Sequence, residues 1–176
     1  IGLTAPSGKR SGISFDIPND NTDPDGLEIL FSQPINDPAN NALSRIMAYD
    51  VIIFKSCFPV SAIRDDAQLE RYKRHYLAIR QFRARHPEKL FIVMTPPPLI
   101  PRPFPGYPAS ASTKPEEAKR ARLFSQWLQS EEFLANMPNV ATFDFFDLLA
   151  EPDNNTAHAN MLRSGYRSLW GLDSHP

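Results

Sequence analysis

The sequence predicts a mixed α/β fold in which a parallel sheet carries helices on both faces. Three apolar runs rich in β-branched and aromatic residues lie at 50–54, 89–95 and 140–146 and read DVIIF, KLFIVMT and VATFDFF. Their nearly continuous apolar character is typical of strands buried on both faces, as in a parallel sheet. Two segments with a helical spacing of apolar residues separate the runs. This alternation of strands and helices predicts that the strands pair in parallel.

The segment before the first run is predicted to be rich in loops. Residues 1–42 contain many Pro, Gly, Asn and Asp residues, which favour turns, and only LEILFSQ at 27–33 is expected to form a short element. The alternating core of strands and helices is expected over 43–176. The whole chain, 1–176, is therefore interpreted as one domain.

The first predicted helix lies between the first two runs and ends before Pro87. Its apolar residues recur at steps of three and four: Leu69, Tyr72, Tyr76, Ile79 and Phe82. Residues 64–89 include eight Lys or Arg residues against four acidic ones, and this basic face of the helix is predicted to be solvated. Because the aromatic residues fall on the apolar stripe, the basic face lacks the exposed aromatics typical of nucleic-acid binding.

The second predicted helix begins close to Thr113. Thr113 and Glu116 have the spacing of a capping box, and Pro115 suits a first helical turn. The proline-rich segment at 95–108, TPPPLIPRPFPGYP, suits neither a strand nor a helix and is predicted to be a stiff surface loop. Asp144, near the end of the third run, is assigned to a turn or a helix cap.

The composition is that of a soluble globular chain. It has 176 residues, 41% of them hydrophobic and 22% charged, with a net charge of −1, which gives no general reason to expect nucleic acid or an acidic membrane surface as partner. No apolar run approaches the roughly 20 residues of a membrane-spanning helix. The single cysteine, Cys57, excludes an intrachain disulfide, and the compartment, cytoplasmic or exported, stays open. Because the chain starts at Ile1, it is expected to be processed, trimmed or a fragment.

A candidate site is predicted at the carboxyl edge of the sheet. Ligands of open parallel sheets bind outside the carboxyl ends of the strands, which here are followed by KSCFP at 55–59 and TPPPL at 95–99. The chain closes on GLDSHP, and Asp173 and His175 are expected to reach the same edge. A carboxylate next to a histidine fixes the histidine tautomer and stabilises its charged form. The pair is therefore interpreted as part of a hydrolytic site.

These blocks resemble the later blocks of the SGNH, or GDSL-type, hydrolases, a family of esterases, lipases, carbohydrate deacetylases and acyltransferases. The resemblance covers roughly residues 48–176 and rests on DVIIFKSCFP, LFIVMTPPPL, VATFDFFDLLA and LDSHP in that order. It implies a three-layer, flavodoxin-like sandwich, here incomplete at both ends. It further implies hydrolysis of a small acyl ester or a carbohydrate acetyl ester, with no cofactor.

The resemblance also assigns roles to single residues. His175 becomes the general base for a serine nucleophile, and Asp173 orients it, although the family usually has its aspartate one position earlier, where Leu172 stands. The family's oxyanion block, Gly-x-Asn-Asp, corresponds to Lys55-Ser56-Cys57-Phe58. Ser56 is expected to offer its hydroxyl or its backbone N–H to an oxyanion, and Lys55 could hold an anionic substrate.

The family's serine block is not visible. Ser7, followed by Gly12, is the weak candidate within the chain, and the nucleophile is otherwise expected upstream of Ile1. One alternative is a cysteine hydrolase built from Cys57, Asp173 and His175, although Cys57 also suits a small buried residue. The other is a non-catalytic relative that binds a ligand, such as a glycan. No histidine has the spacing of a metal ligand, so no metal site is expected.

Overall fold

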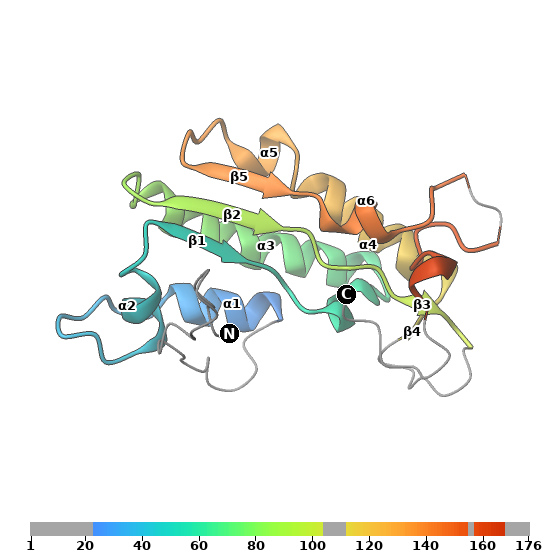
Figure 1. Ribbon diagram of the computed structural model, residues 1–176, viewed down its shortest axis with the longest axis horizontal. Coiled ribbons are helices and arrows are strands. Elements are labelled where there is room, and N and C mark those ends of the chain that lie inside the picture. Colours follow the sequence, from blue (N-terminus) through green and yellow to red (C-terminus); the bar gives the residue numbers. More distant parts are fainter. Residues whose placement is uncertain (1–22, 104–111, 155–156, 168–176) are drawn as a thin grey trace, which may run out of the picture.

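A parallel sheet of three strands forms the centre of the computed structural model, which describes residues 23–103, 112–154 and 157–167 (Figure 1). The strands are β1 (Val51–Phe54), β2 (Leu90–Met94) and β5 (Val140–Phe143), in the order β1-β2-β5. Phe54 lies beside Val93, and Met94 lies beside Phe143, so the three strands end nearly level. The predicted mixed α/β fold with a parallel sheet is confirmed.

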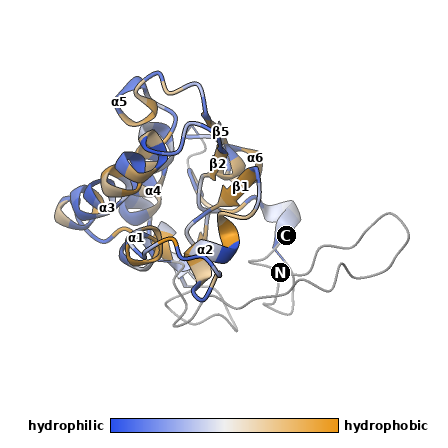
Figure 2. Ribbon diagram, turned by 90° about the vertical axis from the view of Figure 1, so that its left-hand side faces the viewer, coloured by the Kyte–Doolittle hydropathy of each residue, from blue (hydrophilic) through white to orange (hydrophobic). Residues whose placement is uncertain are grey.

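Four helices lie together on one side of this sheet (Figure 2). They are α1 (Pro24–Phe31), α3 (Asp66–Ala84), α4 (Pro115–Trp127) and α5 (Glu131–Leu134). The helix predicted between the first two runs is α3, and it ends before Pro87 as expected. Its N-cap is Asp65, whose carboxylate accepts a hydrogen bond of 2.7 Å from the Gln68 N–H.

The helix α1 arises from the segment predicted to be rich in loops. The short element expected in LEILFSQ belongs to this helix, which begins earlier, at Pro24. Its residues Leu27, Leu30 and Phe31 are buried in the main hydrophobic cluster. The Phe31 ring lies 4.9 Å from the Phe54 ring and 5.3 Å from the Phe82 ring. The helix therefore joins the core, because its apolar residues recur on one face. A further short helix, α2 (Ala42–Ile46), follows it.

The start of α4 lies one residue after the predicted capping box. The N-cap is Lys114, and Glu117 takes the part predicted for Glu116: its carboxylate accepts a 3.0 Å hydrogen bond from the Lys114 N–H. Thr113 instead forms the short strand β4 (Ser112–Thr113). Pro115 occupies the first position of the helix, where a missing N–H leaves no hydrogen bond unmade.

The prediction of helices on both faces of the sheet is wrong for the residues that the structure describes. Ile52 is 4% exposed and Phe91 is fully buried under the helices, whereas Ile53 is 58% exposed and Phe143 is 43% exposed on the opposite face. Successive side chains of a strand point to opposite faces, so the apolar runs supply two apolar faces. The described chain covers only one of them, and it forms two layers rather than three.

The third apolar run is not a strand along its whole length. β5 ends at Phe143, and the residues FFDLL form a short helix, α6 (Phe145–Leu149). The change of direction is set by Asp144, whose carboxylate accepts a 3.1 Å hydrogen bond from the Asp147 N–H and so caps the new helix. The cap predicted for Asp144 is confirmed.

The proline-rich segment lies inside the molecule at its beginning, which corrects the predicted surface loop. Residues 95–100 are all buried, and Ile100–Pro101 forms strand β3, which pairs in parallel with β4. Prolines have no N–H, so burying them leaves only carbonyl groups to satisfy. The Ser61 hydroxyl donates to the Pro97 carbonyl at 2.7 Å, and the Leu162 N–H donates to the Leu99 carbonyl at 2.8 Å. Residues 104–111 lie outside the described chain.

One arginine of the basic helix face is buried, contrary to the prediction of a solvated face. The Arg83 side chain is fully buried, and its guanidinium carbon lies 4.5 Å from the centre of the Phe133 ring. None of its three nitrogens has a hydrogen-bond partner among the described residues. Burial lowers the pKa of Arg83 to about 10, because a charged group is unfavourable away from water.

Candidate functional site

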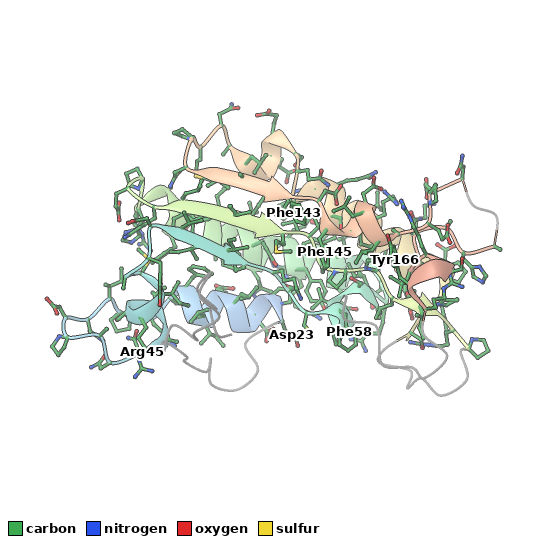
Figure 3. The ribbon with its side chains drawn as sticks, in the orientation of Figure 1. Asp23, Arg45, Phe58, Phe143, Phe145 and Tyr166 are labelled. Atoms are coloured by element: carbon green, nitrogen blue, oxygen red, sulfur yellow. The ribbon has the colours of Figure 1, made fainter. Side chains whose placement is uncertain are left out.

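The turns that leave the strands meet at the carboxyl edge of the sheet, as expected. Lys55, Ser56 and Cys57 follow β1, Thr95 follows β2, and Asp144 follows β5. After Cys57 the chain enters a short 3-10 helix, η1 (Phe58–Ser61). Figure 3 marks this edge with the labelled side chains of Phe58, Phe143 and Phe145.

Ser56 points away from this edge and into the helical layer. It is fully buried, and its hydroxyl lies 2.8 Å from the hydroxyl oxygen of Tyr76 on α3. Burial raises the pKa of Tyr76 to about 12, while the hydrogen bond with Ser56 opposes that rise. The hydroxyl that the sequence assigned to an oxyanion is therefore turned toward Tyr76.

Lys55 and Cys57 have the opposite orientation. Both are half-buried, on either side of the inward-facing Ser56, and the Cys57 thiol is free. Cys57 is the N-cap of η1, and its carbonyl accepts a 3.2 Å hydrogen bond from the Val60 N–H. Its own N–H makes no hydrogen bond to another described residue. Of the three predicted residues after β1, these two are the more exposed.

A polar network joins the ends of β2 and β5. The buried Thr95 hydroxyl donates to the Asp144 carboxylate at 3.1 Å and accepts from the Phe146 N–H at 2.7 Å. Gln129, in the turn that follows α4, donates to the second carboxylate oxygen of Asp144 at 2.9 Å. Asp144 thus joins the end of β2, the start of α6 and the turn after α4, which is a structural role for a carboxylate at the edge.

The catalytic residues assigned by sequence lie outside the described chain. Asp173, His175 and Ser7 all lie outside residues 23–103, 112–154 and 157–167, which the structure describes. The described chain leads toward that segment through η3 (Ser164–Tyr166), which follows the contact of Leu162 with the Leu99 carbonyl after β2. The predicted triad therefore stays a prediction.

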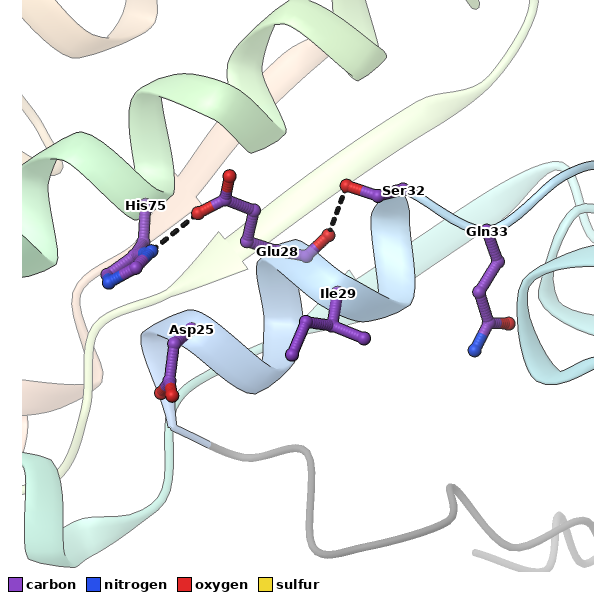
Figure 4. A pocket seen from close by; sticks show the side chains of 6 residues that line it. All are labelled: Asp25, Glu28, Ile29, Ser32, Gln33 and His75. Atoms are coloured by element: carbon purple, nitrogen blue, oxygen red, sulfur yellow. Dashed lines mark hydrogen bonds and ion pairs between the residues drawn. The ribbon is translucent and has the colours of Figure 1, made fainter.

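A cavity that the sequence did not indicate lies between α1 and α3 (Figure 4). It has a volume of about 530 Å³ and is lined by Asp25, Glu28, Ile29, Ser32, Gln33 and His75. The His75 Nδ1 atom and a Glu28 carboxylate oxygen are 2.5 Å apart. The sequence pattern does not show that these two helices pack on each other, so the contact between His75 and Glu28 is visible only in the structure. Lys55, Ser56 and Cys57 do not line the cavity.

The described residues contain neither a metal-binding cluster nor a helix suited to span a membrane. Residues 23–103, 112–154 and 157–167 contain no group of three or more His, Cys, Asp or Glu side chains placed to hold a metal ion. Over the same residues, no helix has the length and apolar character needed to cross a membrane.

The fold and the edge define a mixed α/β protein with a parallel sheet whose strand ends meet in one place. Comparison with known proteins adds no narrower class: no protein-family model matches the chain, and no curated protein and no solved structure matches it significantly.

Proposed function

We propose that this chain is an SGNH-type ester hydrolase, and that its substrate is a small acyl ester or a carbohydrate acetyl ester. The supporting observation is the level ending of three parallel strands, which gathers the turn at Lys55–Cys57, the turn at Thr95 and the Asp144 network at one edge. Such an edge is where open parallel sheets bind ligands.

In the proposed reaction His175 takes the proton from a nucleophile as the nucleophile attacks the ester carbonyl. His175 then returns that proton to the leaving alcohol, and water hydrolyses the acyl-enzyme in a second round of the same steps. Asp173 stabilises the charged imidazole. The carbonyl oxygen becomes negative during attack, and a backbone N–H at the edge is the donor that stabilises it.

A fluorophosphonate probe followed by peptide mass spectrometry tests the proposal, because the probe reacts with activated serines. We expect one labelled serine, and we expect His175→Ala to abolish labelling and to lower the turnover of p-nitrophenyl acetate by about a hundredfold or more. His86→Ala is the matched control, since His86 follows α3 at the opposite edge of the sheet and its ring contacts the carboxylate of Glu88.

Two other results would reassign the nucleophile or the function. Ester turnover that survives without a labelled serine and is lost in Cys57→Ala would assign the nucleophile to the single cysteine. A protein that neither reacts with the probe nor cleaves the ester is not a hydrolase of this kind. The non-catalytic alternative, favoured by the inward orientation of the Ser56 hydroxyl, would then take its place.

A further inference from the structure

We propose that Tyr76 is a positioning residue whose hydroxyl anchors Ser56 and thereby fixes the turn that carries the backbone N–H of Cys57. The inference rests on the proposed function only for the use of that N–H as an oxyanion donor. The anchoring itself is a property of the turn after β1 and can be measured separately.

Tyr76 lies within the aromatic part of the core. Tyr76 is fully buried, and its ring lies 5.4 Å from the ring of Phe124 and 6.0 Å from that of Phe133. It also stacks on Phe54, the last residue of β1, at 6.4 Å. The same tyrosine thus contacts the strand by its ring and the following turn by its hydroxyl.

The hydrogen bond to Ser56 determines which side chains the turn presents. In an extended chain, neighbouring residues point in opposite directions, so an inward Ser56 turns Lys55 and Cys57 outward. Both are half-buried in the structure. Loss of the anchor would leave the Ser56 hydroxyl buried without a partner, which favours a rearrangement of the turn.

The donor of a hydrogen bond to the oxyanion is therefore the N–H of Cys57 rather than Ser56, the residue assigned from the sequence. The Ser56 hydroxyl is held by Tyr76, whereas the Cys57 N–H makes no hydrogen bond to a described residue. A donor that is fixed before the reaction stabilises a developing negative charge without reorganisation. Tyr76 supplies that fixation, and it does not touch the substrate.

Cys57 provides the measurement, because it is the single cysteine of the chain. Its alkylation by iodoacetamide under native conditions reports how well the turn is held. We expect Tyr76→Phe and Ser56→Ala each to change the alkylation rate by about fivefold, as the loss of one buried hydrogen bond would. The double variant should show no further change, since both substitutions remove the same bond.

Tyr72→Phe is the matched control. Tyr72 lies one turn earlier on α3, and its hydroxyl accepts a 2.7 Å hydrogen bond from Gln68 rather than from the turn. Its removal should leave Cys57 alkylation at the wild-type rate. Urea unfolding of each variant gives the change in global stability, and only a change of alkylation beyond that amount counts as local.

The outcomes separate this inference from the proposed function. Equal alkylation of the wild type and Tyr76→Phe, or additive effects in the double variant, would overturn the anchoring. If the wild type cleaves p-nitrophenyl acetate, Tyr76→Phe should lower kcat with little change in KM, and an unchanged kcat would overturn the positioning role. If the wild type cleaves no ester while alkylation changes as expected, the hydrolase proposal fails and the anchor stands.

Discussion

Tyr76 and Arg83 show how differently two buried polar side chains of one helix are accommodated. Both belong to α3 and both are fully buried, but Tyr76 has a hydrogen-bond partner in Ser56, whereas the guanidinium of Arg83 has none among the described residues. Burial disfavours the charged form of each: it raises the pKa of Tyr76 and lowers that of Arg83. Both residues should therefore affect stability in a measurable way.

Tyr76 should make the protein less stable at alkaline pH. Below pH 10 the tyrosine is neutral in both the folded and the unfolded state, so its contribution to the stability of the protein is fully present. Between pH 10 and about 12 only the unfolded chain releases the proton, and stability falls by up to about 1.4 kcal/mol per pH unit. Tyr76→Phe removes this loss, so urea midpoints of the two proteins should converge as the pH rises from 10 to 12. Parallel pH curves would contradict the pKa shift.

Replacing Arg83 with methionine should raise the free energy of unfolding by about 1 kcal/mol or more. Methionine keeps the apolar contact with Phe133 but removes a buried charge that has no hydrogen bond within the described chain. Urea denaturation measures the change. Arg85→Met is the control, because Arg85 also lies over an aromatic ring, that of Phe82 at 6.0 Å, but is exposed. A strong destabilisation by Arg83→Met would mean that the guanidinium has a partner in the folded protein.

At the scale of elements, the sheet and α1 show which apolar residues hold the layers together. The helices cover the face of the sheet that contains Ile52, Phe91 and Val93, and α1 packs on α3 through its own apolar face. The His75 and Glu28 contact joins the same two helices at the surface. Such a partly exposed polar contact contributes little compared with the buried aromatic residues.

Adjacent isoleucines of β1 give a direct test of the one-sided coverage. Ile52→Ala should lower the free energy of unfolding by about 3 kcal/mol, because Ile52 is 4% exposed, whereas Ile53→Ala should lower it by less than about 1 kcal/mol, because Ile53 is 58% exposed. The two substitutions remove the same atoms from neighbouring positions. Equal losses in urea denaturation would show that the second face is also covered in the folded protein.

The docking of α1 can be tested in the same manner. Phe31→Ala should lower the free energy of unfolding by about 4 kcal/mol, since its ring contacts Phe54, Phe82 and Phe91. Ile29→Ala, at a position on the same helix that is 61% exposed, should have little effect. Similar small effects of both variants would mean that α1 is not part of the cooperative core.

At the scale of the whole molecule, β2 is the strand on which the other parts converge. It pairs with β1 on one side and β5 on the other, and it leads into the buried proline segment. The strands end at one edge, so the candidate site lies directly beside the central strand of the sheet. A rigid scaffold of this kind fixes the residues of an adjacent site.

Native-state hydrogen exchange should identify β2 as the most protected element. The Phe91 N–H bonds to the Asn139 carbonyl and the Leu90 N–H bonds to the Asp50 carbonyl, both at 2.9 Å, so this strand exchanges only when both neighbours separate. The amides of α2, a helix of five residues, should exchange much faster. Faster exchange in β2 than in α2 would contradict its central place.

The sequence by itself determined the three strands, the two long helices and the parallel pairing of the strands. The reason is that the spacing of apolar residues is a local property of the chain. It also placed the turn at Lys55–Cys57 at the edge. Only the tertiary structure decided that one face of the sheet lacks helices among the described residues, that residues 95–100 are buried, and that Ser56 faces Tyr76. These features depend on which distant segments pack together, and twenty residues separate the partners of the Ser56 and Tyr76 bond. Apolar spacing predicts where strands and helices form, and only the packing of distant segments decides which of their apolar faces is covered.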